Sequence, residues 1–262
     1  MAALLIKMEK IIHRSIHTLF ISIIFILMTA CSTTPNIDDS KVIDNSDPIE
    51  NTNRSIYNFN EGLDNYIFEP VANAYTTVTP DFFRSGVTNF FQNVLYLNVI
   101  LNSSLQGKLD QSLSDIFRFV FNSTIGVGGL LDVATPMGLE QHDEDFGQTL
   151  AVWGSPQGAY LTIPALGPSS IRDIPDQASR YFTNPINYMA TTISFPVMSL
   201  YFVNLRANLL SASDLRDEAA IDAYSFTREA YLQSRRNKIY DGNPPAEDFD
   251  ALFDEEFLDA PP

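Results

Sequence analysis

The chain has 262 residues, enough for one large domain with its own core or for two small ones, and we expect one. It carries 32 acidic side chains against 16 basic ones, a formal net charge of −16, which argues against binding nucleic acid or anionic headgroups through a basic surface. Its one cysteine cannot form an intramolecular disulfide. Because the chain has only this cysteine and three histidines, it offers few ligands for a transition-metal site.

The first 30 residues have the pattern of a secretory signal peptide. Three basic residues precede an apolar run over residues 19–27, which is too short for the ~18 to 20 residues of a membrane span. Small residues then come directly before Cys31, and this order resembles the lipobox of bacterial lipoproteins, in which the cysteine is acylated and becomes the new N-terminus. We therefore predict a cleaved signal at 1–30 and lipidation at Cys31. The alternatives are an unpaired thiol beside an ordinary cleavage site and an uncleaved anchor.

Residues 31–46 are polar and predict a flexible tether. Apolar residues at helical spacing over 56–67 predict an amphipathic helix that Pro70 should disturb. A second helix is predicted from residue 80 or 81 to about 102, and a third over 108–122 has the cleanest apolar stripe. Each stripe fits either the core of a helical domain or a surface that faces lipid.

The next part of the chain is rich in glycine and proline. An apolar segment over 125–134 is interrupted by glycines, which predict a bend or a close approach of another backbone. Residues 138–175 predict a long ordered loop region, with short strands near 149–153 and 160–163.

The C-terminal third returns to helical periodicity. One helix is predicted over 186–210, restarted or kinked at Pro196, and the last runs from residue 213 or 214 to 240. Residues 241–262 are acidic with no basic residue and predict a disordered tail.

Motifs of common enzymes and cofactor sites are incomplete. His142, the one histidine after the signal, lies in a charged stretch that is more typical of a solvated loop than of a Ser-His-Asp triad. Residues 153–158 lack the first glycine of a nucleophile elbow, residues 143–147 lack the glycine of an EF-hand turn, and residues 126–131 lack the third glycine of a dinucleotide fingerprint. We therefore predict no enzyme, no metal and no cofactor, with a hydrolase that depends on His142 as an alternative.

Several motifs follow one another between Asp47 and about Gly242. They are DPIE at 47–50, NR at 53–54, YNFN at 57–60, RF at 118–119, NSTIGVGGLLDVA at 122–134, DFGQTL at 145–150, WG at 153–154, LGPS at 166–169, RD at 172–173, RA at 206–207, LL at 209–210 and REAY at 228–231. This series resembles the MlaA (VacJ) family of outer-membrane lipoproteins. The chain departs from the family at Thr52, where an aromatic often stands, and at residues 155–160, where the family has a more glycine-rich turn.

The resemblance implies a mostly α fold over residues 47–240, a ring-like bundle of amphipathic helices embedded in the periplasmic leaflet of the outer membrane around a polar-lined channel. It implies a protein that removes misplaced phospholipids from the outer leaflet, passes them to the soluble periplasmic carrier MlaC and associates with trimeric porins, thereby maintaining lipid asymmetry. Ser32, in place of the Asp of inner-membrane retention signals, resembles lipoproteins sorted to the outer membrane. The alternative function is a scaffolding lipoprotein that binds only proteins.

The resemblance also assigns residues. It implies that four residues of the first helix lie near the channel or support it, and that a glycine bend shapes the pore. The first set is Asn53, Arg54, Asn58 and Phe59, and the second is Gly126, Gly128 and Gly129. The alternative for each is a purely structural role, and for Arg54 an ion pair with an acid such as Glu50.

Overall fold

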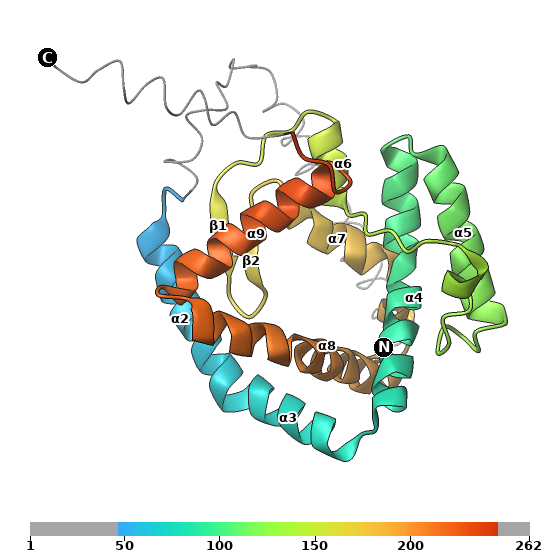
Figure 1. Cartoon of the computed structure of the whole chain (residues 1–262), viewed down its shortest axis with the longest axis horizontal. Helices are drawn as coiled ribbons and strands as arrows, with labels where there is room; N and C mark the ends of the chain where they lie inside the picture. The colour runs from blue at the N-terminus through green and yellow to red at the C-terminus, as the bar shows by residue number, and fades with distance from the viewer. Residues whose placement is uncertain (1–46, 246–262) are drawn as a thin grey trace, which may run out of the picture. The chain divides into compact units, whose positions relative to one another are not determined.

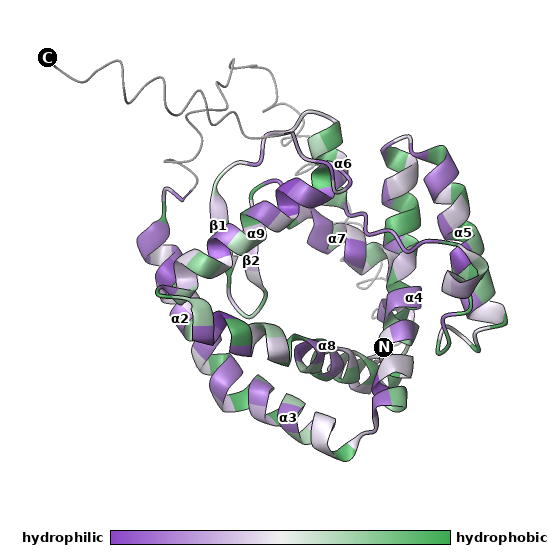
Figure 2. Cartoon of the chain, in the orientation of Figure 1, coloured by the Kyte–Doolittle hydropathy of each residue, from purple (hydrophilic) through white to green (hydrophobic). Residues whose placement is uncertain are grey.

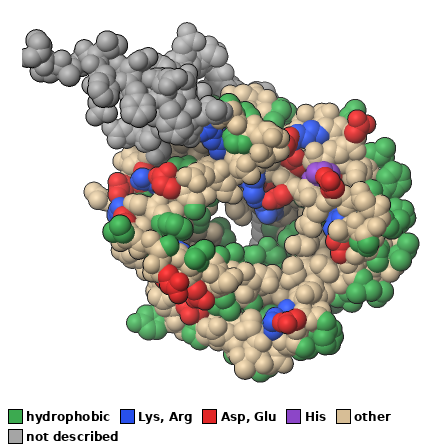
Figure 3. Space-filling view, viewed as in Figure 1, with side chains coloured by type: hydrophobic (Ala, Val, Ile, Leu, Met, Phe, Trp, Pro, Cys, Tyr) green, Lys and Arg blue, Asp and Glu red, His purple; other side chains and the backbone are tan. Residues whose placement is uncertain are grey.

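The computed structural model describes residues 47–245; the predicted signal peptide, Cys31, the tether and the acidic segment 246–262 lie outside the described residues. Helices follow one another around a central opening, with one two-stranded sheet between them (Figure 1). The opening remains when every atom is drawn in full (Figure 3). The predicted ring of helices is therefore confirmed. Among residues 47–245, no helix is long and apolar enough to cross a membrane.

The first side of the ring is a helix that changes pitch. Helix α2 (Glu50–Leu63) continues through a π-helical turn, η3 (Asp64–Phe68), into α3 (Glu69–Val78). Pro70 lies in the first turn of α3, where its missing N–H would leave a regular helix one hydrogen bond short. The predicted disturbance at Pro70 thus takes the form of a π turn before it, and the helix does not end there.

Helices α4 (Asp81–Leu105) and α5 (Leu109–Thr124) form a hairpin on the next side of the ring, with α4 beside the opening and α5 on its outer side (Figure 1). Both were predicted to within three residues. The glycine bend follows α5 and is also confirmed, because Gly128 and Gly129 have φ of 70° and 90°.

Residues 138–175 contain more structure than predicted. The strand expected at 149–153 is wrong: Phe146–Val152 form helix α6, because the Asp145 carboxylate caps it by accepting a 2.9 Å hydrogen bond from the Gln148 N–H. Strand β1 (Tyr160–Ile163) is confirmed. It pairs antiparallel with β2 (Gly167–Ser170), which was not predicted, and Tyr160 lies opposite Ser170.

The remaining helices close the ring. They are α7 (Ile174–Thr183), α8 (Thr191–Ala219) and α9 (Ala223–Ile239), with short 3₁₀ turns η4 (Thr135–Met137) and η5 (Pro185–Tyr188). The predicted break near residue 213 is wrong. Helix α8 runs through that point, where Arg216 is bound by both carboxylate oxygens of Glu61 on α2, and the break falls at 220–222, where Asp222 caps α9. Pro196 lies within α8 near its start and does not interrupt it.

The interior of this ring wall is mostly polar. Among residues 47–245, the buried side chains comprise ten hydrophobic and twenty-two polar or charged ones, while forty large hydrophobic residues are exposed. The hydrophobic core is limited to two small clusters, one around Tyr57, Tyr160 and Tyr224 and one around Val87, Phe91 and Ile186. Hydropathy accordingly alternates along the helices instead of marking one apolar centre (Figure 2). This distribution is the reverse of that in proteins surrounded by water.

Candidate functional site

Helix α5 shows the burial of polar residues and the exposure of hydrophobic ones most clearly. Its apolar stripe is between 40 and 70% exposed, whereas four polar residues on its other face are 5% exposed or less. The exposed residues are Leu109, Leu113, Ile116, Phe117 and Val120, and the buried ones are Ser112, Asp115, Arg118 and Asn122. Of the two interpretations of this stripe, core or lipid-facing surface, the structure rules out the core. Hydrophobic side chains also gather on the outer edge of the space-filling view, over α5 and the corner between α3 and α4 (Figure 3).

The central opening has two kinds of wall. Basic and acidic side chains gather on the side formed by α6, α7 and α9, whereas hydrophobic side chains gather on the α8 side (Figures 1 and 3). In agreement with this, exposed aromatic and aliphatic residues are frequent along the first half of α8, including Ile193, Phe195 and Leu200. The opening therefore presents polar and apolar surfaces to the same space.

The wall formed by α6, α7 and α9, called the charged wall below, contains a buried cluster of ion pairs. This cluster, the ionic joint, consists of Arg235, Asp145 and Asp173 and links three helices. Arg235 of α9 donates from Nη2 to Asp145 Oδ1 at 3.0 Å and to Asp173 Oδ1 at 2.9 Å, and from Nη1 to Asp145 Oδ2. Asp145 caps α6 and Asp173 lies at the start of α7, so one guanidinium joins the N-termini of two helices to the C-terminal helix. Gly147 permits this approach, because a Cβ there would lie 2.1 Å from Asp173 Oδ1.

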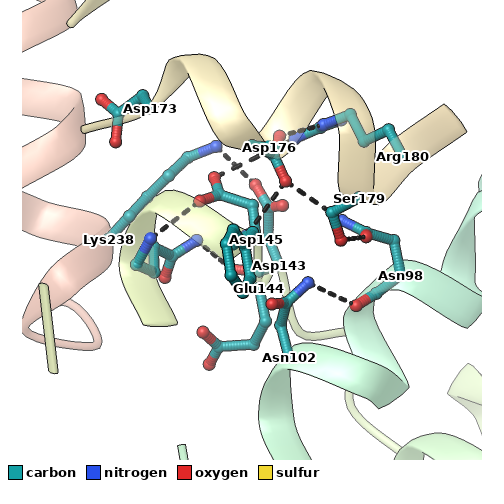
Figure 4. Close-up of polar contacts among 12 residues, drawn as sticks. Asn98, Asn102, Asp143, Glu144, Asp145, Asp173, Asp176, Ser179, Arg180 and Lys238 are labelled. Carbon is teal, nitrogen blue, oxygen red and sulfur yellow. Dashed lines mark hydrogen bonds and ion pairs between the residues drawn. The ribbon is translucent and has the colours of Figure 1, made fainter. Parts of the chain in front are cut away.

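A second set of contacts joins α7 to α4 (Figure 4). Asp176 Oδ1 accepts from the Phe146 N–H at 2.9 Å and from Asn98 Nδ2 at 3.4 Å, and Asn98 Oδ1 accepts from Ser179 Oγ at 2.6 Å. Asp176 also accepts from Nε of Arg180, one turn further along α7. The carboxylate of Asp176 thus fixes both the start of α6 and the direction of the Arg180 side chain.

Asp145 and Arg235 remain ionised over a wide pH range. Burial alone would raise the pKa of Asp145, but the hydrogen bonds and charge of Arg235, with the Gln148 N–H and the charge of Arg180, lower it to about 2. Burial likewise opposes the charge of Arg235, yet Asp145 and Asp173 raise its pKa above the ordinary value. Each charge therefore stabilises its partner in a place where an isolated charge would be costly.

His142 belongs to a different network, between α4 and α5. Its Nδ1 lies 2.8 Å from Oδ1 of the fully buried Asp115, which also accepts from Tyr96 Oη at 2.7 Å and from Ser103 Oγ at 3.0 Å. In a catalytic triad the histidine lies between serine and aspartate, whereas here the aspartate lies between serine and histidine. The network links helices, and among residues 47–245 no hydroxyl group is hydrogen-bonded to the His142 imidazole. No group of three or more His, Cys, Asp or Glu side chains in the described part of the chain is arranged to hold a metal ion.

The four residues predicted on α2 point in different directions. Asn53 is buried against β1, and Arg54 forms an ion pair with Glu50 at 2.6 Å, as the alternative interpretation expected, and with Asp222 at 2.7 Å. Phe59 is exposed and helps line an open groove of about 690 Å³ beside Ile56 and Pro164. Asn58 is exposed as well.

The glycine bend packs against α4 from the side of α5. A Cβ on Gly129 would lie 2.6 Å from Asn93 Cβ, and a Cβ on Gly126 would lie 2.2 Å from the carbonyl oxygen of Leu131. The bend is thus tightly packed on the outer side of α4, and its effect on the pore stays a prediction. The channel residues of the first helix stay a prediction too.

Sequence reasoning missed the residues of the ionic joint. Asp145 and Arg235 are 90 positions apart, and periodicity carries no information on such a pair. A signal was present: Asp145-Phe146-Gly147 and Arg172-Asp173 occur in the motifs that carry the family resemblance.

Comparison with known proteins decides the relationship. The family model described as MlaA lipoprotein matches residues 45–238. The chain belongs to the MlaA lipoprotein family. Its MlaA relatives include the intermembrane phospholipid transport system lipoprotein MlaA of Escherichia coli (strain K12), which is 34% identical over 192 residues, covering 72% of this chain and 76% of that protein. An uncharacterized protein of Rickettsia bellii (strain RML369-C) is 34% identical over 195 residues, covering 74% of this chain and 76% of that protein.

The MlaA fold is also found among solved structures. One structure, reported as "Structural basis for maintenance of bacterial outer membrane lipid asymmetry", superimposes on this chain with a TM-score of 0.65 at 30% sequence identity. The match covers 76% of this chain and 100% of the other. The ring of helices is therefore shared with an experimentally determined protein.

Proposed function

We propose that this chain is an outer-membrane lipoprotein that takes misplaced phospholipids from the outer leaflet through its central opening and passes them to a soluble periplasmic carrier. The observation that carries the proposal is the pairing of a charged wall with an apolar wall around one opening. A phospholipid has a charged headgroup and apolar chains, so both of its parts find a matching surface inside the same ring.

The outer surface supports a position within one leaflet. The apolar face of α5 and the corner between α3 and α4 would cost free energy in water, whereas contact with acyl chains would remove that cost. A segment outside the described residues supplies the proposed anchor, acylated Cys31. Its lipid would hold the ring at the periplasmic side of the outer membrane.

Two partners complete the proposal. The family resemblance names the periplasmic carrier MlaC as acceptor and a trimeric porin as membrane partner. Lipid would move down a free-energy gradient maintained by other proteins, and the chain itself would act without catalysis. Phe59 and Asn58, exposed on α2, are assigned to the lipid path in this proposal; substituting both and measuring outer-leaflet phospholipid at equal protein level tests that assignment.

The experiment that separates transport from scaffolding uses the purified, acylated chain in vesicles that contain labelled phospholipid. Carrier added in solution is recovered and its labelled lipid is measured, with vesicles lacking the chain as the control. Transport predicts that the carrier gains label only when the chain is present. A scaffolding lipoprotein that binds only proteins would leave the carrier unlabelled in both samples.

A further inference from the structure

Arginines in or next to the charged wall of the opening differ in exposure, as Arg172, Arg180 and Arg235 show. The side chains of Arg172 and Arg235 are 6 and 8% exposed, whereas that of Arg180 is 44% exposed. Arg180 is on α7, which borders the opening (Figure 1). Of these three cations, only Arg180 therefore has surface to offer to a molecule inside the ring.

The guanidinium of Arg180 is fixed on one side and free on the other. Its Nε donates to Asp176, and its Nη2 lies 3.9 Å from Asp145 Oδ2, beyond hydrogen-bond distance. No other hydrogen bond from this side chain is present among residues 47–245. An arginine has five N–H donors in a rigid fork, so the two terminal nitrogens keep donors for a ligand while Asp176 holds the stem (Figure 4).

We propose that Arg180 contacts the phosphate of the phospholipid headgroup inside the opening. This inference rests on the proposed function and names the group of the substrate that the wall recognises. Arginine binds phosphate oxygens through paired N–H donors, and the ligand needs to displace none of the contacts with Asp176. The phosphodiester is common to phospholipids with different headgroups, so Arg180 would recognise the class and not one headgroup.

The surroundings favour brief binding. Asp143, Asp145 and Asp176 all act on Arg180 electrostatically, and these carboxylates repel an anion that approaches the same wall. A transport path requires binding that is strong enough for entry and weak enough for release. Arg180 thus marks one place on the charged wall where a phosphate can bind and leave again.

The test compares variants of the acylated full chain in the vesicle-to-carrier assay. The probes are a labelled phosphatidylethanolamine and a diacylglycerol with the same labelled chains, which lacks the phosphate. For each probe the rate of a variant is divided by the rate of the wild-type chain, so that the carrier's own preference cancels. Arg180→Gln and Arg180→Lys are the variants, and Arg228→Gln, which removes an arginine ion pair with Glu229 on α9, is the control.

Arg180→Gln is expected to slow phosphatidylethanolamine transfer about tenfold, because a charge-assisted hydrogen bond is lost, and to leave diacylglycerol transfer unchanged. Arg180→Lys should restore part of the rate of phosphatidylethanolamine transfer, and Arg228→Gln should change the transfer of neither probe. An equal change for both probes, or none, overturns the inference. Absence of transfer by the wild-type chain would instead overturn the proposed function.

Discussion

Asn53 and Asn60 lie two turns apart on α2, and each binds the backbone of the β1 hairpin with both ends of its amide. Asn53 donates to Tyr160 O at 3.1 Å and accepts from Thr162 N at 2.9 Å; Asn60 donates to Ile163 O at 3.0 Å and accepts from Ala165 N at 2.7 Å. Seven helical residues rise about 10 Å, close to the length of three strand residues, so the two spacings match. The amides take the place of a third strand at the edge of β1.

This relationship predicts that alanine substitutions at Asn53 and Asn60 lower the free energy of unfolding by different amounts. Asn53→Ala removes the amide that binds the buried Tyr160 carbonyl and Thr162 N–H, together with one of the hydrogen bonds to Asp47, and should lower the free energy of unfolding by about 2 to 3 kcal/mol. Asn60→Ala, at a half-exposed site where water can replace the amide, should cost about 1 kcal/mol. Denaturant unfolding in detergent micelles measures both. Exposed Asn58→Ala is the control, and equal losses for all three variants would contradict the account.

The outward face of α5 predicts a change in membrane binding without a change in fold. Replacing Leu113 and Phe117 by Ser should weaken vesicle binding of the non-acylated chain by roughly tenfold or more, because each half-exposed side chain can bury apolar surface worth about 1 kcal/mol. Flotation with vesicles measures the binding. Ser112→Ala, on the buried face of the same helix, is the control. Unchanged flotation of the double variant would show that this face does not contact hydrocarbon.

The close approach at Gly147 predicts a severe effect of one methyl group. A Cβ would lie 2.1 Å from Asp173 Oδ1 and 2.7 Å from Arg235 Nη2, so Gly147→Ala should push the buried joint apart and lower the free energy of unfolding by about 3 kcal/mol. Gly62→Ala in α2 is the matched control, because nothing lies within 4 Å of its Cβ and alanine favours helix by about 0.5 to 1 kcal/mol. Equal stability of the two variants would show that the joint tolerates displacement.

The lowered pKa of Asp145 predicts how stability depends on pH. Its pKa is about 2 in the folded chain against 3.8 for the ordinary group, so folding favours the ionised form. The resulting contribution, about 2 kcal/mol, is fully present above about pH 4 and is lost as pH falls from about 4 to about 2. Unfolding titrations at fixed ionic strength measure it. Asp145→Asn should be less stable at pH 7 and should vary less across this range, and parallel curves for both proteins would contradict the assignment.

The sequence predicted α4 and α5 well but not which of their faces are buried. Periodicity located α4 and α5 to within three residues, because a regular stripe needs only local spacing. It could not tell that Leu113 faces outward while Asp115 faces inward, since the same stripe suits a core or a lipid surface. The ring itself came from the family resemblance.

The residues of the charged wall could not be predicted from the sequence for a related reason. Asp145 starts a helix inside a region rich in glycine and proline, where local signals favour loops, and its role depends on Arg235 ninety positions later. Asn53 was predicted to lie near the channel or to support it, and that role stays a prediction; its place against β1 rests on contacts with residues more than a hundred positions away. Long-range pairs of buried polar groups decide these positions, and no local pattern reports them.

The central claim is that the opening holds phospholipid with its headgroup against the charged wall and its chains against α8. The most direct measurement uses two phospholipids in vesicles, one with a photoreactive group on the headgroup and one with the group on an acyl chain, and maps the adducts on the chain by mass spectrometry. The account predicts headgroup adducts on α6, α7 or α9 and acyl-chain adducts on the first half of α8, in addition to adducts on the outer face of α5. Adducts on the outer faces alone, with none from either probe around the opening, would contradict it.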